Sequence, residues 1–208
     1  MKALLINGSP RPNGCTFTAL TELANTLEAE GIETEIVHVG NKDIRGCIAC
    51  RRCHSTGSNK CVFDDIVNEV APKLAEADAF IIGAPVYFGS PAGGAISFMD
   101  RLFFSTLNID KTMKVGASVV TCRRGGNTAS YDVLNKYFTI SGMPVASSQY
   151  WNSIHGREQG QAEMDEEGRQ TMRVLARNMS FLMKSIALGK EKYGLPEKEE
   201  HLWTHFIR

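Results

Sequence analysis

Four cysteines that lie close together in the sequence are the residues of this chain best suited to metal or redox chemistry. Gaps of two, two and seven residues separate Cys47, Cys50, Cys53 and Cys61. Two-residue gaps let successive thiolates turn toward one cubane, and a more distant cysteine supplies the fourth ligand, as in bacterial ferredoxin loops. The spacing therefore predicts a [4Fe-4S] cluster. Two alternatives stay open, because Cys-x2-Cys pairs also bind structural zinc and the same loop can remain free of metal.

A second group of chemically capable residues forms a short loop rich in glycine and hydroxyl side chains. It follows the apolar run 3–7 and precedes a helical pattern, so the free N–H groups and the positive end of a helix face it. Ser9 and Thr16 add hydroxyl donors, and Arg11 adds a guanidinium. This combination predicts a phosphate site, the alternative being a tight polar turn with no ligand. The expected contacts are Ser9, Arg11, Asn13, Gly14, Cys15 and Thr16.

The spacing of the glycines indicates which phosphate this loop suits. Five residues separate Gly8 from Gly14 and no lysine follows, unlike the loop of a nucleoside triphosphate site. The Gly-x-Gly-x-x-Gly pattern of dinucleotide sites is also absent. A single dianionic phosphate, such as that of flavin mononucleotide (FMN), fits the loop better.

The composition argues against several other classes of function. The 208 residues include 23 Lys and Arg and 23 Asp and Glu, so the formal net charge is zero. This balance argues against a nucleic-acid binder or a polybasic membrane-surface protein. The first apolar run is too short for a signal peptide, and no stretch reaches the roughly 18 apolar residues of a membrane span. We therefore expect a cytoplasmic protein with reduced cysteines and with no nucleic-acid or membrane partner.

Apolar runs alternate with helical patterns along the chain, which predicts an α/β fold with a parallel sheet between helices. One domain is expected over residues 1–188, followed by a tail over 189–208. The expected strands are 3–7, 33–39, 79–84, 115–121 and 145–150, and the longer expected helices are 16–30, 95–105, 128–140 and 165–188.

Several loops in combination resemble one protein family. The motif Gly-Ser-Pro-Arg-x-x-Gly-x-Thr at 8–16 looks like the FMN-phosphate loop of the NADPH-dependent FMN reductase family. The motif Pro-Val-Tyr-Phe-Gly-Ser at 85–90 looks like its flavin-ring loop, and the cysteine motif with the acidic pair after it, 47–65, resembles its iron–sulfur flavoprotein branch. The stretches 99–101 and 150–156 resemble further parts of related sequences. The resemblance implies a flavodoxin-like three-layer sandwich whose five-stranded parallel sheet has the order 2-1-3-4-5.

In a sheet of that order, ligands bind outside the carboxyl ends of the first and third strands, where the strand order reverses. The loops that leave these two strands therefore converge on one crevice. The aromatic side chains of the second loop suit a flat isoalloxazine ring and its glycine allows close backbone approach, unless those aromatics belong to the core or to an interface. The expected contacts are Pro85, Val86, Tyr87, Phe88 and Gly89.

The loop after the fourth strand is expected to form a third wall of the crevice. The arginines at 123 and 124 either stabilise an anionic reduced flavin or are solvated loop charges. His155, after the fifth strand, either lines a nicotinamide pocket or is structural or solvent-facing. By the resemblance, the backbone of the third loop contacts the pyrimidine edge of the flavin, with Thr121, Cys122, Arg123, Gly125 and Gly126 as its contacts.

Together these expectations describe an FMN-binding, NAD(P)H-dependent oxidoreductase. Hydride passes from the nicotinamide to the flavin, and the electrons leave to free flavin, a quinone, another small acceptor or a redox protein. The flavin carries the chemistry, so no catalytic side chain is required. The alternative is an electron-transfer iron–sulfur flavoprotein that passes electrons between a [4Fe-4S] cluster on the flavin side of the sheet and FMN. A structural zinc protein with an empty phosphate loop is a third possibility.

The tail over 189–208 combines helix breakers with large apolar residues. These side chains pack either on the body of the same chain or on a neighbouring subunit, since exposed apolar patches often mark interfaces. A homodimer or homotetramer is therefore expected. The tail residues concerned are Tyr193, Leu202, Trp203, Phe206 and Ile207.

Overall fold

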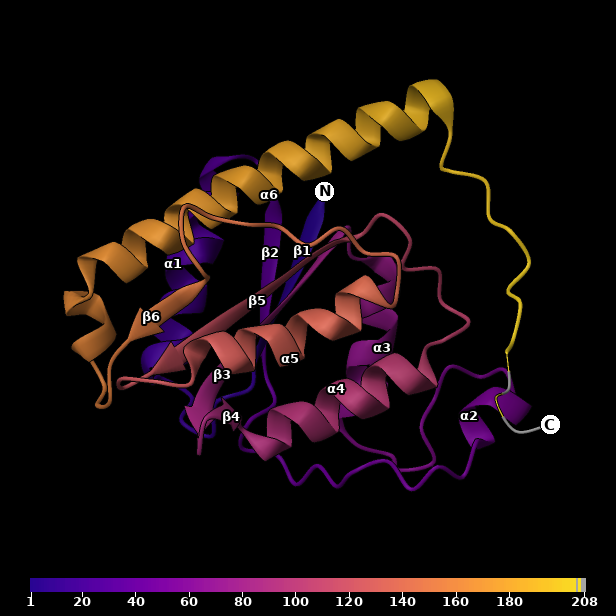
Figure 1. Ribbon diagram of the computed structural model, residues 1–208, viewed down its shortest axis with the longest axis horizontal. Helices are drawn as coiled ribbons and strands as arrows, with labels where there is room; N and C mark the ends of the chain where they lie inside the picture. Colours follow the sequence, from indigo (N-terminus) through magenta and orange to yellow (C-terminus); the bar gives the residue numbers. More distant parts are fainter. Residues whose placement is uncertain (205, 207–208) are drawn as a thin grey trace.

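The computed structural model describes residues 1–204 and 206 and shows a parallel sheet between two layers of helices (Figure 1). The order β2-β1-β3-β5-β6 corresponds to the expected 2-1-3-4-5, because the additional strand β4 only forms a short antiparallel hairpin with the end of β3. The predicted three-layer fold is therefore confirmed. The strands are β1 Lys2–Asn7, β2 Glu33–His38, β3 Ala79–Tyr87, β4 Ser90–Pro91, β5 Val115–Cys122 and β6 Ser153–His155.

Two sets of helices cover the two faces of the sheet. Helices α1 and α6 pack on one face, and α3, α4 and α5 pack on the other. The short helix α2 and the 3₁₀ helix η1 lie in connecting loops. The helices are α1 Cys15–Ala29, α2 Arg52–Ser55, α3 Ile66–Glu76, α4 Gly93–Ser105, α5 Asn127–Thr139, η1 Gln161–Met164 and α6 Glu166–Tyr193.

The central strand β1 shows why the chain folds into these layers. Its side chains alternate between the faces of the sheet, so Leu5 joins the core under α1 and α6 while Leu4 and Ile6 join the core under α3 and α4. All three are fully buried. Burial of such a side chain stabilises the fold by about 1.5–3 kcal/mol. A strand that is apolar on both faces is thus fixed at the centre of the sheet.

The position of the last strand differs from the prediction. The sequence predicts a strand at 145–150, but Val145 forms only an isolated bridge with Gly116, and the strand itself is β6. The residues between them bond to α6: Ser148 Oγ donates to the carbonyl of Thr171 at 2.7 Å, and Asn178 Nδ2 donates to the carbonyl of Ser147 at 2.8 Å. These polar groups draw the segment away from β5, so pairing resumes only at β6.

Helix α6 and the tail also differ from expectation. The sequence predicts the helix end near 188, whereas α6 continues to Tyr193 and ends before Gly194, whose φ is +77°. The chain beyond it runs along the outside of the molecule toward α2 (Figure 1, yellow). Leu202, Trp203 and Phe206 are 87%, 80% and 96% exposed, so they do not pack on the body of their own chain. Ile207 lies outside the described residues.

Close contacts join the predicted phosphate loop, residues 8–16, to the end of β2 and to the start of the cysteine-rich loop, residues 40–63. His38 Nε2, at the end of β2, lies 2.8 Å from the carbonyl oxygen of Ser9. The backbone of Gly40 comes so near Ser9 that a Cβ atom on Gly40 would overlap the carbonyl group of Ser9. Only glycine fits at position 40, because any Cβ atom would overlap Ser9.

Along the described part of the chain, no helix combines the length and the apolar character that crossing a membrane demands.

This contact predicts that alanine destabilises the protein at Gly40 but not at Gly46, a glycine of the same loop. Gly40→Ala is expected to lower the free energy of unfolding by about 1–3 kcal/mol, or roughly 2–10 °C in melting temperature, because backbone atoms must move. Gly46→Ala is the matched control, since nothing lies within 4 Å of its Cβ position. Calorimetry of both variants measures the difference, and equal melting temperatures would contradict the required close contact.

Candidate functional site

The three predicted loops meet around one hollow at the carboxyl ends of β1, β3 and β5. The hollow has a volume of about 180 Å³. Five of the expected contacts do not line it: Asn13, Phe88, Gly89, Gly125 and Gly126. Its walls are Ser9, Arg11, Gly14, Cys15 and Thr16 from the first loop, Pro85, Val86 and Tyr87 from the second, Thr121, Cys122 and Arg123 from the third, and Gly156 and Arg157.

The floor of the hollow is the N-terminus of α1, which no side chain caps. Gly14 occupies the capping position and offers no side-chain acceptor, and the first turn contains no acidic residue. The first N–H groups of a helix have no partner within the helix, and they carry its positive dipole end. Thr16 is buried beside them, with its hydroxyl 2.7 Å from that of Thr121. An anion of phosphate size would supply the acceptors that this end of the helix lacks.

Internal hydrogen bonds fix the shape of the phosphate loop. The backbone N–H of Ser9 donates to Asn7 Oδ1 at 3.1 Å, and Ser9 Oγ accepts from the N–H of Arg11 at 3.2 Å. Asn7 Nδ2 in turn donates to the carbonyl of Pro12 at 3.1 Å. Because the loop satisfies its own turns, the amides at the start of α1 remain for a ligand.

The loop after β6 is a wall that the sequence analysis did not include. Arg11 Nη1 donates to the carbonyl of Arg157 at 2.8 Å and lies 3.8 Å from a carboxylate oxygen of Glu158. Cys15 Sγ donates to the carbonyl of Glu158 at 3.3 Å. These contacts bring Gly156 and Arg157 to the hollow. The available signal was their position directly after a strand at the same sheet edge, which was obscured when that strand was placed at 145–150.

The second loop forms a hairpin that separates its two aromatic residues. Val86 and Tyr87 pair with Pro91 and Ser90, and the turn residues Phe88 and Gly89 have φ angles of +52° and +74°. Positive φ at both turn residues is the requirement of a type I′ turn. Tyr87 lines the hollow, whereas the ring of Phe88 is fully exposed. A bulky residue at positive φ is unusual, and here its side chain contributes nothing to the core.

The third loop packs against this hairpin through a glycine. Gly126 has a φ of +93°, and a Cβ atom there would come within 2.8 Å of Gly89 Cα and Val86 Cγ1. Gly126 therefore sets the spacing of two walls without lining the hollow itself. Cys122 is buried, and burial raises the pKa of its thiol, so it stays protonated at neutral pH and acts as a small apolar wall.

His155 has partners of its own outside the hollow. Its Nδ1 lies 3.3 Å from Asp165 Oδ2, and its backbone N–H donates to the same oxygen at 2.6 Å. Asp165 also caps α6 by accepting from the N–H of Gly168 at 2.9 Å. This arrangement favours the structural interpretation of His155, as part of the junction between β6 and α6.

The four clustered cysteines face a second, smaller cavity of about 20 Å³, beside the C-terminal half of α4. Cys53 is buried and Cys61 is half-buried, whereas Cys47 and Cys50 are exposed. Among the described residues, no three Cys, His, Asp or Glu side chains converge closely enough to hold a single metal ion. Four thiols around one cavity are the donor set of a [4Fe-4S] cluster and equally that of a structural zinc site.

The place of this cavity differs from the expectation of a cluster on the flavin side of the sheet. The hairpin precedes α4, whereas the cavity is bordered by Arg101, Phe104 and Ser105 near the end of that helix. Helix α2 lies beyond this end in Figure 1. His54 of α2 lies 3.0 Å from the carbonyl oxygen of Phe104 and stacks on its ring at 4.4 Å. These contacts hold the loop along α4 and away from the hollow.

A comparison with protein families decides the relationship of the chain. The family model of NADPH-dependent FMN reductase matches residues 1–158, which include all three loops around the hollow. The chain belongs to this family. As an FMN reductase family member it is a flavoprotein oxidoreductase with a flavodoxin-like fold, and the resemblance seen in the sequence is confirmed.

Two relatives are similar to this FMN reductase family member over most of the chain. It is 33% identical over 193 residues to an iron–sulfur flavoprotein of Methanocaldococcus jannaschii, covering 89% of this chain and 99% of the relative. It is 29% identical over 195 residues to an iron–sulfur flavoprotein of Methanosarcina thermophila, covering 92% and 100%.

Solved structures similar to this family member share its fold. The structure of RosB with bound 8-demethyl-8-formylriboflavin-5′-phosphate has a TM-score of 0.69 at 18% identity, covering 100% of this chain and 94% of RosB. A flavodoxin from the domain Archaea has a TM-score of 0.60 at 16% identity, covering 88% and 99%. At these identities the likeness concerns the fold alone.

The hairpin predicts different results for its two aromatic residues. Tyr87→Ala is expected to weaken FMN binding about tenfold, because stacking on an aromatic ring contributes ~1–3 kcal/mol. Phe88→Asn is expected to change FMN affinity less than about twofold and to leave the melting temperature unchanged or higher, because asparagine accepts positive φ. Titration of each variant with FMN, followed by fluorescence quenching, measures both. Equal losses in the two variants would contradict the assignment of Tyr87 alone to the hollow.

Proposed function

We propose that this chain binds FMN in the hollow and uses it to pass electrons from NAD(P)H to a small acceptor or a redox protein. The observation that supports this most strongly is the uncapped N-terminus of α1, enclosed by three loops at the point where the strand order reverses. Dinucleotide and mononucleotide ligands bind at this place in open α/β sheets. Membership of the FMN reductase family supports the same ligand.

Different residues around the hollow suit different parts of FMN. The amides at the start of α1, with the hydroxyls of Ser9 and Thr16, suit the phosphate. Tyr87 suits the face of the ring system, and the loop carrying Thr121 and Arg123 suits its polar edge. When bound, FMN supplies the redox chemistry, and the protein contributes position and electrostatics. Tyr87 is exposed, which leaves one side of the hollow open to a second substrate.

Arginine side chains give the rim of the hollow a positive character. Arg11, Arg123 and Arg157 border it, and the nearby carboxylate of Glu158 offsets part of their charge. Positive charge near the flavin favours its anionic reduced form. It also suits the phosphates of a pyridine nucleotide.

An electron-transfer role is the second candidate, and the cysteine cavity favours it. We propose that Cys47, Cys50, Cys53 and Cys61 hold a [4Fe-4S] cluster. Four thiols around one cavity support this proposal, as do the names of the relatives that are similar over most of the chain. In that case electrons pass between the cluster and FMN, and the cluster needs the reducing cytoplasm that we propose as the location.

We further propose that the chain forms a homodimer or a homotetramer. Trp203 and Phe206 in the tail and Phe88 at the turn of the β3–β4 hairpin are exposed aromatic residues. Exposed apolar groups of this size are typical of interaction surfaces.

FMN binding is tested with two threonines of α1. Thr16→Val is expected to weaken FMN binding about tenfold, since it removes a hydroxyl donor that suits the phosphate and a hydrogen bond to a charged group contributes about 1.5–3 kcal/mol. Thr18→Val, two residues further along the helix and outside the hollow, is the matched control. Calorimetric titration with FMN measures both affinities. A wild-type protein that binds no FMN would overturn the proposed function.

The choice between enzyme and carrier is tested by anaerobic reduction of the purified protein. Prompt bleaching of the flavin absorbance by NADPH or NADH is the result expected for the oxidoreductase. Reduction only by a ferredoxin-like donor would instead favour the electron carrier. Iron, sulfide and zinc analysis of the same preparation separates a cluster from a zinc site and from an empty loop.

A further inference from the structure

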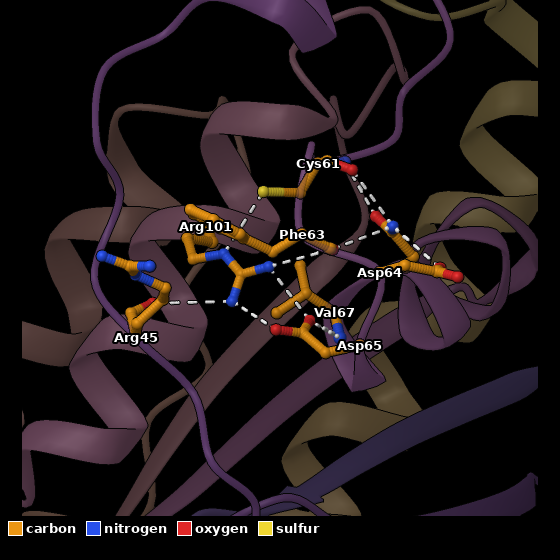
Figure 2. A network of polar contacts seen from close by, with 8 residues as sticks. Arg45, Cys61, Phe63, Asp64, Asp65, Val67 and Arg101 are labelled. Atoms are coloured by element: carbon orange, nitrogen blue, oxygen red, sulfur yellow. Dashed lines mark hydrogen bonds and ion pairs between the residues drawn. The ribbon is translucent and has the colours of Figure 1, made fainter.

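Arg101, in the C-terminal half of α4, is a charged side chain with almost no exposure. Only 1% of the residue is accessible, and it is the largest of the fully buried side chains in the described part of the chain. A buried charge is costly unless it is paired and hydrogen-bonded. All of its polar partners come from residues 45–65, which comprise most of the cysteine-rich loop and the cap of α3 (Figure 2).

Each of the five N–H donors of this guanidinium has an acceptor. Nη1 and Nη2 donate to the two carboxylate oxygens of Asp65 at 2.6 and 3.0 Å. Their second hydrogens reach the carbonyl oxygens of Arg45 at 3.5 Å and Phe63 at 3.3 Å. The remaining donor, Nε, is directed at Cys61 Sγ at 3.3 Å. Four donors therefore hold the chain on both sides of the cysteine motif, and the fifth holds one of its thiols.

The surroundings of Arg101 reinforce this geometry. The guanidinium lies 5.1 Å from the ring centre of Phe63, over which Arg45 also lies, at 4.8 Å. Asp65 is fixed in turn, because its Oδ1 accepts from the N–H of Val67 as the cap of α3. The direction of Nε toward Cys61 is thus set by rigid partners on the other edge of the guanidinium.

We propose that Arg101 is a positioning residue for the cysteine cluster, which presents Cys61 to the cavity and donates a hydrogen bond to its sulfur. This role rests on the proposed [4Fe-4S] cluster. A thiolate ligand accepts a stronger hydrogen bond than a neutral thiol does, because the bond is charge-assisted. Hydrogen bonds and positive charge at a ligand sulfur stabilise the reduced, more negative cluster and so raise its reduction potential.

The role of the hydrogen bond is tested separately from that of the charge. Arg101→Gln removes the charge and the planar guanidinium, whereas Arg101→Lys keeps a charge but has no Nε donor at the same place. Both variants are expected to make reduction of the cluster at least tenfold less favourable, which is about 59 mV more negative for one electron. Arg52→Gln, which removes an exposed arginine between the ligand cysteines, is the matched control and is expected to change the potential less.

The measurement is a redox titration of the anaerobically reconstituted cluster, followed by electron paramagnetic resonance, with iron, sulfide and FMN content determined for each variant. FMN content is expected to stay at the wild-type value, because Arg101 does not line the flavin hollow. A loaded cluster with wild-type potential in both Arg101 variants overturns the role. A potential that falls in Arg101→Gln but not in Arg101→Lys overturns the hydrogen bond and leaves a charge effect only.

A measurement on the wild-type protein covers the case in which the Arg101 variants do not fold. Protein labelled with ¹⁵N-arginine and reduced by one electron is expected to show, by electron–nuclear double resonance, a coupling from an exchangeable proton and its ¹⁵N to the cluster. A loaded cluster without this coupling overturns the role of Arg101 alone. A wild-type chain that takes up no iron and sulfide overturns the proposed cluster and this role together.

Discussion

The start of α1 is a cluster of backbone donors that no capping side chain of the helix satisfies. Gly14 has no side chain to cap the helix, and no carboxylate follows in the first turn. The polar groups that lie near it, in Asn7 and Ser9, are occupied in shaping the loop. The sheet then places this end of the helix at the edge where the strand order reverses. Local capping and global topology thus concentrate positive potential at one point, and the three loops only have to enclose it.

Helix α4 links this point to the cysteine cavity. Its first residue follows the hairpin of the hollow, and its last two turns border the cavity. At 1.5 Å per residue, the 13 residues of α4 span about 20 Å, so the length of this helix separates the hollow from the cysteine cavity. The apolar face of α4 packs on the core through Phe98, Met99 and Leu102, which are fully buried. Arg101 is on the same helix, so the element that fixes one end of the hairpin also fixes the cysteine-rich loop.

The sequence predicts the hollow well because its signals are local. A strand, a polar glycine-rich loop and a helix are read from neighbouring residues, and the topology rule then brings the loops together. The wall at Gly156 and Arg157 could not be found in this way, because the polar residues around Ser148 bond to α6 and shift the last strand. The direction of Phe88 depends on a positive φ that composition does not reveal.

The hydrogen bonds of Arg101 could not be predicted from the sequence for a different reason. Its partners lie 36 to 56 residues away in the chain, and nothing local connects them. The one available sign is the helical spacing of this arginine, which lies three residues after Phe98 and three residues before Phe104. The place of the cysteine cavity depends on this network and on the docking of α2 on Phe104, both of which are tertiary contacts. Spacing groups the four cysteines in the sequence, and packing determines where they lie in the fold.

The separation of Tyr87 from Phe88 has a consequence for how such a protein can diversify. Tyr87 is part of a wall of the hollow, whereas Phe88 projects from the tip of a two-residue turn and touches no core side chain. Exchange of the tip residue therefore changes the entrance without disturbing the fold beneath it. Substitutions at this one position can therefore vary the surface beside the hollow while the lining of the hollow stays the same.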